Sequence, residues 1–385
     1  MIIKSFNIKK ILDSRGNWTI ELELYNEKNI GVKSSAPSGK STGKNEAKVL
    51  DVLKSFKAAK FIFSKIKNKN FKSQKEFDDF LINLDGTKNK SRLGGNTTLV
   101  FSYCFSKLFS YENKIELYKH FNKLLNLNIK PQMPRLFMNM INGGLHAGNN
   151  LNFQEYLVIP KTTNINQAID LGINFYKHLG LELKKIKGNN AINIGDEGGY
   201  APNFKNNLEP FEIMKKLMKK LNLENYFDFG MDAAANSINW SDEKLERFYL
   251  KLIQKINLIY LEDPFKEEGF KKFAELKLKF KNIHICGDDL TTTNIFRIEK
   301  AYKENSINAV IIKPNQIGTI SETIEAIKFA KKQNWWVVVS HRSGETNEDL
   351  IADLAYGVGA NGFKLGAPAR GERISKYNRL LEIAG

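Results

Sequence analysis

The first part of the chain alternates apolar and polar residues in a way that predicts an antiparallel sheet followed by helices. Residues 19–25 read TIELELY, which has the period of two of a half-buried strand. Residues 13–17, DSRGN, come just before it and are typical of a turn, so a hairpin or meander opens the chain. Helical periodicity follows at about 44–65, 74–84 and 97–110. Strands succeeded by helices predict a small α+β domain, which we place at residues 1–125.

From about residue 134 the pattern changes to short apolar runs separated by helical stretches. The runs cover residues 157–160, 191–194, 227–231, 258–261, 283–286, 309–312, 336–339 and 362–365. Continuous runs of this kind are typical of buried parallel strands joined by helical crossovers. The repeat of strand and helix predicts a (β/α)8 barrel, which we place at residues 126–385. An open doubly wound sheet has the same repeat, but it would normally gather its functional residues at one switch point.

A charged or catalytic-type residue stands near the end of seven successive runs. These residues are Glu197, Asp232, Glu262, Asp288, Lys313, His341 and Lys364, spaced 23 to 35 residues apart. The carboxyl ends of barrel strands carry the active site, so we expect these side chains to converge. Asp232, Glu262 and Asp288 form an all-oxygen set that suits Mg²⁺ or Mn²⁺. Any one acid is readily explained as a helix cap, but three in succession followed by a lysine favour a metal site.

Two lysines and one loop extend the predicted site. Lys313 and Lys364 are costly to bury at a barrel mouth unless they are paired or used. Bound cations lower the pKa of a nearby lysine, which suits a general base at neutral pH. The loop at 340–346, SHRSGET, brings together His341, Arg342 and Ser343. A guanidinium presents a planar fork of donors that matches phosphate or carboxylate oxygens, so we expect an anion site here, with a structural ion pair as the alternative.

Two glycine-rich loops are expected to close over a ligand, because glycine permits both a hinge and a close backbone approach. They are PSGKSTG at 37–43 and GGLHAGNN at 143–150. The GKS at 39–41 resembles the end of a phosphate-binding P-loop. In strict register, however, Ser34 stands where the first glycine of that motif is required, so a P-loop is excluded.

Composition and charge set limits on the class of protein. The chain has 385 residues, of which 42% are hydrophobic and 26% charged, and it contains no apolar run of the length of a signal peptide or a membrane span. We therefore expect a soluble, cytoplasmic protein. The two cysteines, Cys104 and Cys286, are expected to be packing residues. The net charge is +17, and residues 54–75 carry eight lysines and no acid. A nucleic-acid surface is one interpretation of this stretch, and a solvated helix face is the favoured one.

The motifs taken together resemble the enolase family, and the resemblance runs nearly from end to end. The motifs that carry it are DSRGN (13–17), PSGKSTG (37–43), NGGLHAGNNLNFQEY (142–156), IGDEGGYAPN (194–203), GMDAA (230–234), YLEDPF (260–265), GDDLTTTN (287–294), IIKPNQIGT (311–319), SHRSGET (340–346) and GAPARGER (366–373). The resemblance implies an enolase-like α/β barrel of (β/α)8 type with a smaller N-terminal α+β capping domain. It also implies two Mg²⁺ ions per active site, with Mn²⁺ as an alternative, and a homodimer or higher homo-oligomer. Lys40 departs from the pattern, since the family usually has a small residue there.

The resemblance further implies a hydro-lyase of glycolysis and gluconeogenesis that dehydrates a phosphorylated hydroxy acid, 2-phosphoglycerate, to phosphoenolpyruvate. Lys313 would be the base and Glu197 the acid, with Glu155 and His341 also catalytic. The metal ligands would be Asp232, Glu262 and Asp288, with Ser41 on the second ion. The substrate would contact His146, Gln154, Arg342, Ser343, Lys364 and Ser41.

Two alternatives remain open. One is another lyase of the enolase superfamily that acts on a different hydroxy acid, although the anion loop at 340–346 favours a phosphorylated substrate. The other is an inactive homologue that binds RNA or acts as a scaffold through the 54–75 surface. Loss of Lys313, Glu197 or a metal carboxylate would favour that interpretation, and all of them are present.

Overall fold

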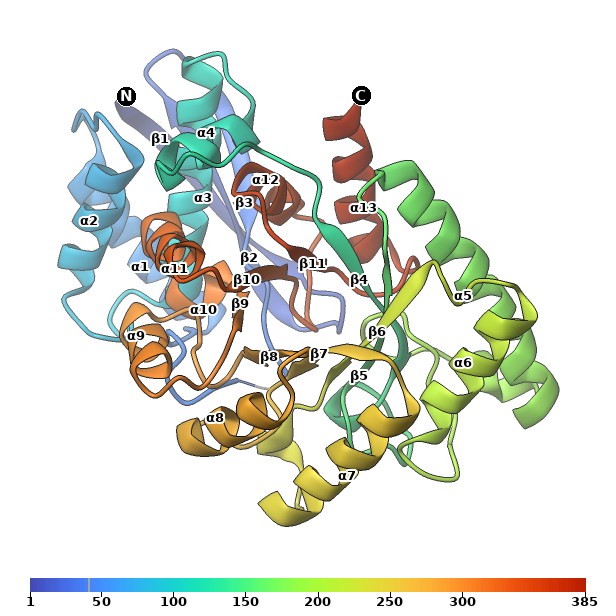
Figure 1. Ribbon diagram of the computed structural model, residues 1–385. Coiled ribbons are helices and arrows are strands. Elements are labelled where there is room, and N and C mark those ends of the chain that lie inside the picture. Colours follow the sequence, from blue (N-terminus) through green and yellow to red (C-terminus); the bar gives the residue numbers. More distant parts are fainter. Residues whose placement is uncertain (41) are drawn as a thin grey trace.

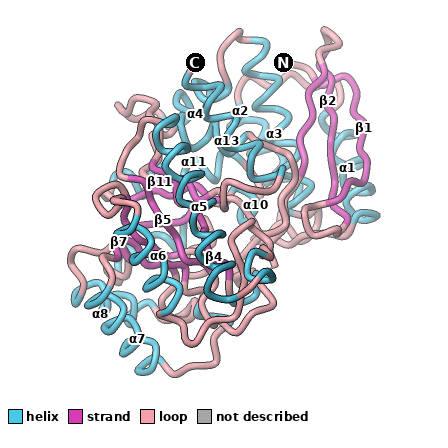
Figure 2. Tube along the Cα trace, turned by 90° about the vertical axis from the view of Figure 1, so that its right-hand side faces the viewer, coloured by secondary structure: helices cyan, strands magenta, loops and turns pink. Residues whose placement is uncertain are grey.

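The N-terminal part of the chain forms a three-stranded antiparallel sheet that lies beside a barrel (Figures 1 and 2). The computed structural model describes residues 1–40 and 42–385. Strands β1 (Ile3–Leu12), β2 (Trp18–Asn26) and β3 (Gly31–Ser35) pair in that order. The predicted turn joins β1 to β2, and the Asp13 carboxylate accepts the backbone N–H groups of Arg15 and Asn17 at 2.9 and 2.8 Å. The strand at 19–25 and the hairpin are therefore confirmed.

Four helices follow this sheet. They are α1 (Val52–Ile66), α2 (Gln74–Asp85), α3 (Gly95–Glu112) and α4 (Leu117–Leu125). The predicted helix at 44–65 begins eight residues late, because residues 44–51 bond outward instead of to each other. Ala47 N–H, for example, donates to the Gln316 carbonyl at 2.7 Å, and Asp51 then caps the helix by accepting from Lys54 N–H. Helix α4 was not predicted.

The barrel is closed and has eight strands in the order β10-β11-β4-β5-β6-β7-β8-β9. Its strands are β4 (Arg135–Asn142), β5 (Glu155–Pro160), β6 (Phe227–Asp232), β7 (Leu258–Glu262), β8 (His284–Gly287), β9 (Ala309–Ile312), β10 (Trp336–Ser340) and β11 (Gly362–Lys364). The helices that surround it in Figure 1 are α5 (Ile165–Lys187), α6 (Glu209–Lys220), α7 (Asp242–Lys255), α8 (Phe270–Lys279), α9 (Ile295–Lys303), α10 (Pro314–Ile317), α11 (Ile320–Lys332), α12 (Leu350–Gly357) and α13 (Gly371–Ala384). The barrel prediction is confirmed, whereas the boundary at residue 125 stays a prediction.

Two details of the predicted barrel are wrong. Residues 191–194 are not a strand: Asn189–Ile192 is a short 3-10 helix, and Ile192 and Ile194 are exposed. The missing strand is β4, whose apolar run is interrupted by Asn139 and Asn142. Strand β5 is also antiparallel to β4 and β6, because a loop without a crossover helix joins β4 to β5. The barrel is therefore of a mixed kind, with six strand pairs parallel and two antiparallel.

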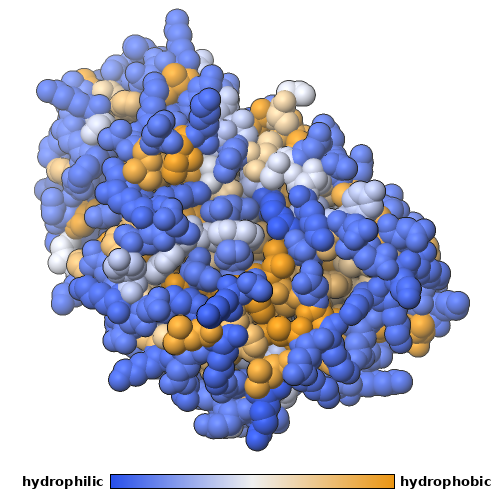
Figure 3. Space-filling view, viewed as in Figure 1, coloured by the Kyte–Doolittle hydropathy of each residue, from blue (hydrophilic) through white to orange (hydrophobic). Residues whose placement is uncertain are grey.

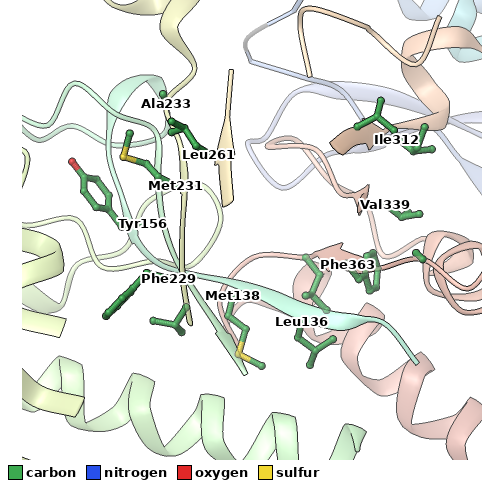
Figure 4. Close-up of a cluster of buried hydrophobic side chains, with 14 of the residues drawn as sticks. Leu136, Met138, Tyr156, Phe229, Met231, Ala233, Leu261, Ile312, Val339 and Phe363 are labelled. Atoms are coloured by element: carbon green, nitrogen blue, oxygen red, sulfur yellow. The ribbon is translucent and has the colours of Figure 1, made fainter. Parts of the chain in front are cut away.

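Two apolar layers stabilise the barrel. Alternate strand residues such as Met138, Phe229 and Val339 point outward and pack beneath the helices (Figure 4). The residues between them, among them Phe137 and Tyr260, fill the interior. A separate core lies between the N-terminal sheet and helices α1 to α3. With the interior filled by side chains, the chemistry is confined to one end of the barrel.

The surface is mostly hydrophilic on the face seen in Figure 3. Among the described residues no helix has the length and apolar character needed to cross a membrane. All eight lysines between positions 54 and 75 are exposed, seven of them in α1 and the segment after it and Lys75 at the start of α2. Both cysteines are buried and free, as predicted.

Candidate active site

One narrow cavity at the carboxyl end of the barrel brings together nine of the predicted site residues. It is lined by Gly39, His146, Gln154, Glu155, Glu197, Lys313, His341, Arg342, Ser343 and Lys364. Glu155 and Lys364 lie on strands β5 and β11, and His146 ends the short 3-10 helix Gly144–His146. The other residues lie at 39, 154, 197, 313 and 341–343, outside the strands and most of them next to a strand end. The predicted convergence at the strand ends therefore occurs, and Gly39 adds the N-terminal part of the chain to the wall.

The Lys364 ammonium lies among three buried carboxylates. Its Nζ is 2.8 Å from Glu262, 3.0 Å from Glu155 and 3.1 Å from Asp232. Burial and the charge of Asp232 raise the pKa of Glu262 to about 8, although Lys364 opposes the shift. Burial lowers the pKa of Lys364 but the carboxylates outweigh it, so this pKa is raised well above its ordinary value. Lys364 is accordingly a fixed positive charge in this site.

The second lysine is paired with the third predicted metal ligand. Lys313 Nζ is in direct contact with Asp288 Oδ2, and both side chains are largely buried. Burial opposes the charge of Lys313, but Asp288 raises its pKa above the ordinary value. The pKa of Asp288 is lowered to about 2, because the attraction of Lys313 and Lys364 exceeds the cost of burial. Lys313 is therefore protonated in this arrangement.

Two compact groups of possible metal ligands occur among the described residues. In each of them one ligand atom per residue lies within 4.8 Å of the others; the groups are His146, Glu155 and Glu197, and Asp263, Asp288 and Asp289. Asp263 accepts the backbone N–H groups of Asp288 and Asp289 at 2.9 and 2.7 Å, which fixes the turn that carries them. The predicted metal ligands are instead paired with lysines: Asp232 and Glu262 with Lys364, and Asp288 with Lys313.

Glu197 and Glu155 are neighbouring carboxyl groups whose pKa values are shifted in opposite directions. Glu197 Oε1 lies 3.2 Å from His146 Nδ1 and 3.4 Å from His341 Nε2, and Asn139 Nδ2 donates to its Oε2 at 2.8 Å. Burial works against its charge, but these contacts hold the pKa of Glu197 well below its usual range. Burial and the charge of Glu197 raise the pKa of Glu155 well above its usual range. Of the two carboxyl groups, Glu155 therefore holds a proton more readily than Glu197 does.

The tautomer of His341 follows from its partner Arg373. Arg373 Nη1 donates to His341 Nδ1 at 2.8 Å, so the ring proton is on Nε2 and faces Glu197. Burial and the Arg373 charge lower the pKa of His341 to about 3, which keeps the ring neutral. Arg373 also donates to the carbonyls of Arg342, Ser343 and Asp196. Helix α13 thus ties the loop of Glu197 to the loop of Arg342.

Several main-chain groups of the N-terminal part contact the anion loop. Ser38 and Gly344 exchange main-chain hydrogen bonds of 2.7 and 2.9 Å, and Lys40 N–H donates to Ser343 Oγ at 2.9 Å. The Lys40 side chain points away from this contact, and its Nζ lies 3.3 Å from Asp196 Oδ2. The lysine that departs from the family pattern therefore forms an ion pair at the mouth of the cavity. The predicted ligand Ser41 lies outside the described residues.

Sequence reasoning missed the residues that support this site. Asn139 and Asn142 on β4 both direct an amide toward Glu197, and the only signal was two polar residues three apart in an otherwise apolar run. Arg373 on α13 was within a quoted motif but was given no role. Among the described residues, several buried side-chain atoms at the site have no hydrogen-bond partner, including the oxygens Asn139 Oδ1, Gln154 Oε1 and Glu155 Oε2. Unsatisfied polar atoms around a cavity are typical of a site built for a polar ligand.

Sequence models of two enolase domains match the chain. The model of the enolase N-terminal domain matches residues 3–121, and that of the enolase C-terminal TIM barrel domain matches residues 130–244 and 236–385. The chain belongs to the enolase family. The enolase of Methanocaldococcus jannaschii is 39% identical over 99% of this chain and 94% of its own length. The enolase of Solanum lycopersicum is 36% identical over 99% and 94%, and that of Sulfurisphaera tokodaii 37% over 98% and 95%.

Membership in the enolase family agrees with the architecture found here, a closed eight-stranded barrel with a smaller N-terminal sheet. It makes the protein an enzyme of the hydro-lyase class. The match covers both parts of the chain, including the loop at 37–43 and every residue that lines the cavity.

Proposed function

We propose that this enolase-family protein catalyses the Mg²⁺-dependent, reversible dehydration of 2-phosphoglycerate to phosphoenolpyruvate in the cytoplasm. The observation that carries the proposal is the cavity itself, where an amine, a pair of carboxyl groups and a guanidinium lie within reach of one small ligand. Removal of a proton next to a carboxylate, followed by loss of a hydroxyl, needs a base, an acid and compensation for extra negative charge. The cavity holds side chains suited to each task.

The acids beneath the cavity fit a hard divalent cation. Asp232, Glu262 and Asp288 offer only oxygen donors, and the raised pKa of Glu262 shows how strongly these buried carboxylates oppose one another. We assign these three residues to a first Mg²⁺ and Ser41 to a second, with Mn²⁺ as an alternative metal. Bound there, the ions would neutralise the acids, compete with Lys313 for Asp288 and offset the charge that develops on the substrate carboxylate.

Lys313 is the proposed base for the proton at C2 of the substrate. Its amine must first lose a proton, and its contact with Asp288 is what keeps that proton in place. Any change that draws the Asp288 charge away lowers the pKa of Lys313 toward the value that a base needs. Lys364 would then hold the substrate carboxylate, since its pKa is raised well above the ordinary value and it stays charged.

The pair of Glu155 and Glu197 is the proposed acid for the leaving hydroxyl. Glu155 carries the proton in the free site, and Glu197 is oriented by His146, His341 and Asn139. The proton passes to the hydroxyl, which leaves as water. Before the next turnover Lys313 releases to solvent the proton that it took from C2, and the pair takes one proton up from solvent. Arg342 and Ser343 are proposed to bind the phosphate, and Gln154 completes the pocket.

The test is to mix the purified protein with 2-phosphoglycerate and Mg²⁺, and to follow phosphoenolpyruvate by its ultraviolet absorbance. We expect turnover that stops when the metal is chelated. Exchange of the C2 hydrogen with deuterated water is measured in parallel, because it reports proton removal separately from loss of the hydroxyl.

Two variants separate the proposed roles. Lys313→Ala should abolish both exchange and turnover, with a loss of about 100-fold or more, as is usual for a general base. Glu197→Gln should abolish turnover but leave exchange measurable. Lys303→Ala, an exposed lysine in the last turn of α9, is the control and should behave like the unchanged protein. Absence of turnover from folded, Mg²⁺-loaded protein would refute the proposed reaction.

A homodimer or higher homo-oligomer remains a prediction from the family resemblance. Binding of nucleic acid through the lysines of 54–75 also remains a prediction, and RNA binding that weakens steeply with added salt would support it.

A further inference from the structure

Glu46 is a buried acid of the N-terminal part that reaches the anion-binding arginine of the barrel. It is 8% exposed, and its carboxylate accepts from both ends of the Arg342 guanidinium, at 3.0 Å from Nη1 and 3.2 Å from Nη2. A two-point contact of this kind fixes the plane of a guanidinium as well as its position. Burial opposes the charge of Arg342, but Glu46 outweighs it and raises its pKa.

The same carboxylate also holds the segment that follows the 37–43 loop. Gly43 N–H donates to Glu46 Oε1 at 3.1 Å, and Glu46 N–H returns a bond to the Gly43 carbonyl at 3.1 Å. This closes a tight turn directly behind the loop. The position of that turn is consequently tied to the position of Arg342 through one side chain.

A third contact links Glu46 to the metal carboxylates. Gln316 Nε2 lies 3.4 Å from Glu46 Oε1 and 2.9 Å from Asp288 Oδ1, and the Gln316 carbonyl accepts from Ala47 N–H. Gln316 is fully buried, and Thr293 fixes its amide by donating to Oε1 at 2.7 Å. Glu46 therefore contacts the turn after the loop and the anion-binding arginine directly, and it reaches the acid paired with Lys313 through Gln316.

We infer that Glu46 is a positioning residue, which orients Arg342 for the substrate phosphate and sets the register of the 37–43 loop against the barrel. This inference rests on the proposed function for its substrate, but the geometry that it describes does not. Glu46 does not line the cavity, and its effect on the reaction is exerted through Arg342 and the loop. A carboxylate that merely competed with the phosphate for Arg342 would have the opposite effect, because removing it would strengthen phosphate binding.

The kinetic test compares Glu46→Gln with the unchanged protein. The amide keeps the length of the side chain but places a donor against the guanidinium. We expect the KM for 2-phosphoglycerate and the inhibition constant of inorganic phosphate to rise about 10- to 100-fold, the size expected when a buried charge-assisted hydrogen bond is lost. The kcat should fall less. In an Arg342→Lys background the same change should have an effect of no more than about threefold, since its target is gone.

A second readout needs no substrate. Lys40 precedes the turn and Lys44 lies within it, so trypsin should cleave after both lysines faster in Glu46→Gln than in the unchanged protein. Asp353→Asn is the matched control, because Asp353 is also buried and accepts from two nitrogens of Arg379, at 2.8 Å each, outside the site. It should lower the thermal midpoint without changing KM or the cleavage at Lys40 and Lys44. Glu46→Asp, which keeps the charge but is shorter, serves if the glutamine variant does not fold, and it should show an intermediate KM.

Three results would overturn the inference: an unchanged or lower KM in Glu46→Gln, an undiminished effect in the Arg342→Lys background, or unchanged cleavage at Lys40 and Lys44. If the unchanged protein does not turn over 2-phosphoglycerate, the proposed function fails, while the cleavage comparison still decides whether Glu46 positions the loop.

Discussion

Replacement of Lys364 by methionine should destabilise the protein in the absence of metal, because it removes the ammonium shared by three buried carboxylates. Glu155, Asp232 and Glu262 are each at most 2% exposed, and all lie within 3.1 Å of Lys364 Nζ. Methionine matches the length and apolar stem of lysine, so the change is mainly one of charge. Removing one partner of a buried ion pair typically costs about 3–5 kcal/mol.

That cost converts to a measurable shift in thermal midpoint. For 385 residues the entropy of unfolding near the midpoint is about 0.8 kcal/mol per degree, so a loss of 3–5 kcal/mol corresponds to about 4–6 °C. The midpoint is measured by scanning fluorimetry at pH 8 with a chelator. Titration with Mg²⁺ should then raise the midpoint of Lys364→Met more than that of the unchanged protein, because the acids no longer have their ammonium.

Lys331→Met is the control for this experiment. Lys331 is also largely buried, but its Nζ donates to neutral oxygens of Gly359 and Asn361, and burial lowers its pKa to about 8. Its loss should lower the midpoint by less and leave the response to Mg²⁺ unchanged. A midpoint for Lys364→Met equal to that of the unchanged protein in chelator would show that the three carboxylates do not depend on Lys364, and the electrostatic reasoning would be wrong.

Three further predictions concern other parts of the molecule. Burial raises the pKa of Asp78 to about 6 from an ordinary 3.8. The contribution of protonated Asp78 to the free energy of unfolding is therefore present below pH 4 and is lost as the pH rises through 6. Asp78→Asn should remove about 3 kcal/mol of this pH dependence, so the thermal midpoint should vary less between pH 4 and 8. Cys104 and Cys286 are fully buried, and burial raises the pKa of both thiols, to about 12 for Cys104. Neither should react with a thiol reagent until denaturant unfolds the protein. Labelling of either cysteine in the folded protein would contradict its role as a packing residue. At Gly195 a Cβ would lie 2.6 Å from the His146 carbonyl, so Gly195→Ala should displace the loop of Glu197 and lower kcat at least about 10-fold; Gly371→Ala, with nothing within 4 Å, should leave kcat unchanged.

The strand ends of the barrel could be predicted because their pattern is local. Asp232, Glu262 and Asp288 each follow an apolar run directly, and the closed barrel brings the ends of adjacent strands together without further information. The direction of β5, in contrast, could not be predicted from the local pattern. Its apolar run is the same whether the strand runs parallel or antiparallel, and the only signal was a glycine-rich connection without a helix.

The position of Glu197 in the site could not be derived from the apolar pattern, because the strand expected before it does not exist. It lies on a loop between α5 and α6, and no strand ends there. Main-chain bonds between Tyr200 and β4, together with Arg373 from α13, hold that loop in place. The two asparagines that obscured β4 in the sequence are the residues that face Glu197. Contacts between distant segments set this part of the site, so a periodicity analysis had no access to them.

The seam between the two parts of the chain has a consequence for how such enzymes diverge and recombine. Ser38 and Gly344 meet through main-chain atoms, but other contacts across the seam depend on side chains, among them Glu46 with Arg342 and Lys107 with Glu348. At Gly344 a side chain is excluded, because a Cβ there would lie 2.6 Å from both Asp13 Oδ2 and Ser38 Oγ. An N-terminal part from a distant relative should therefore dock on this barrel only if it keeps both the backbone path and these side-chain partners, an acid equivalent to Glu46 among them. The seam thus couples sequence change on its two sides, and a chimeric enzyme joined here needs matched pairs across it.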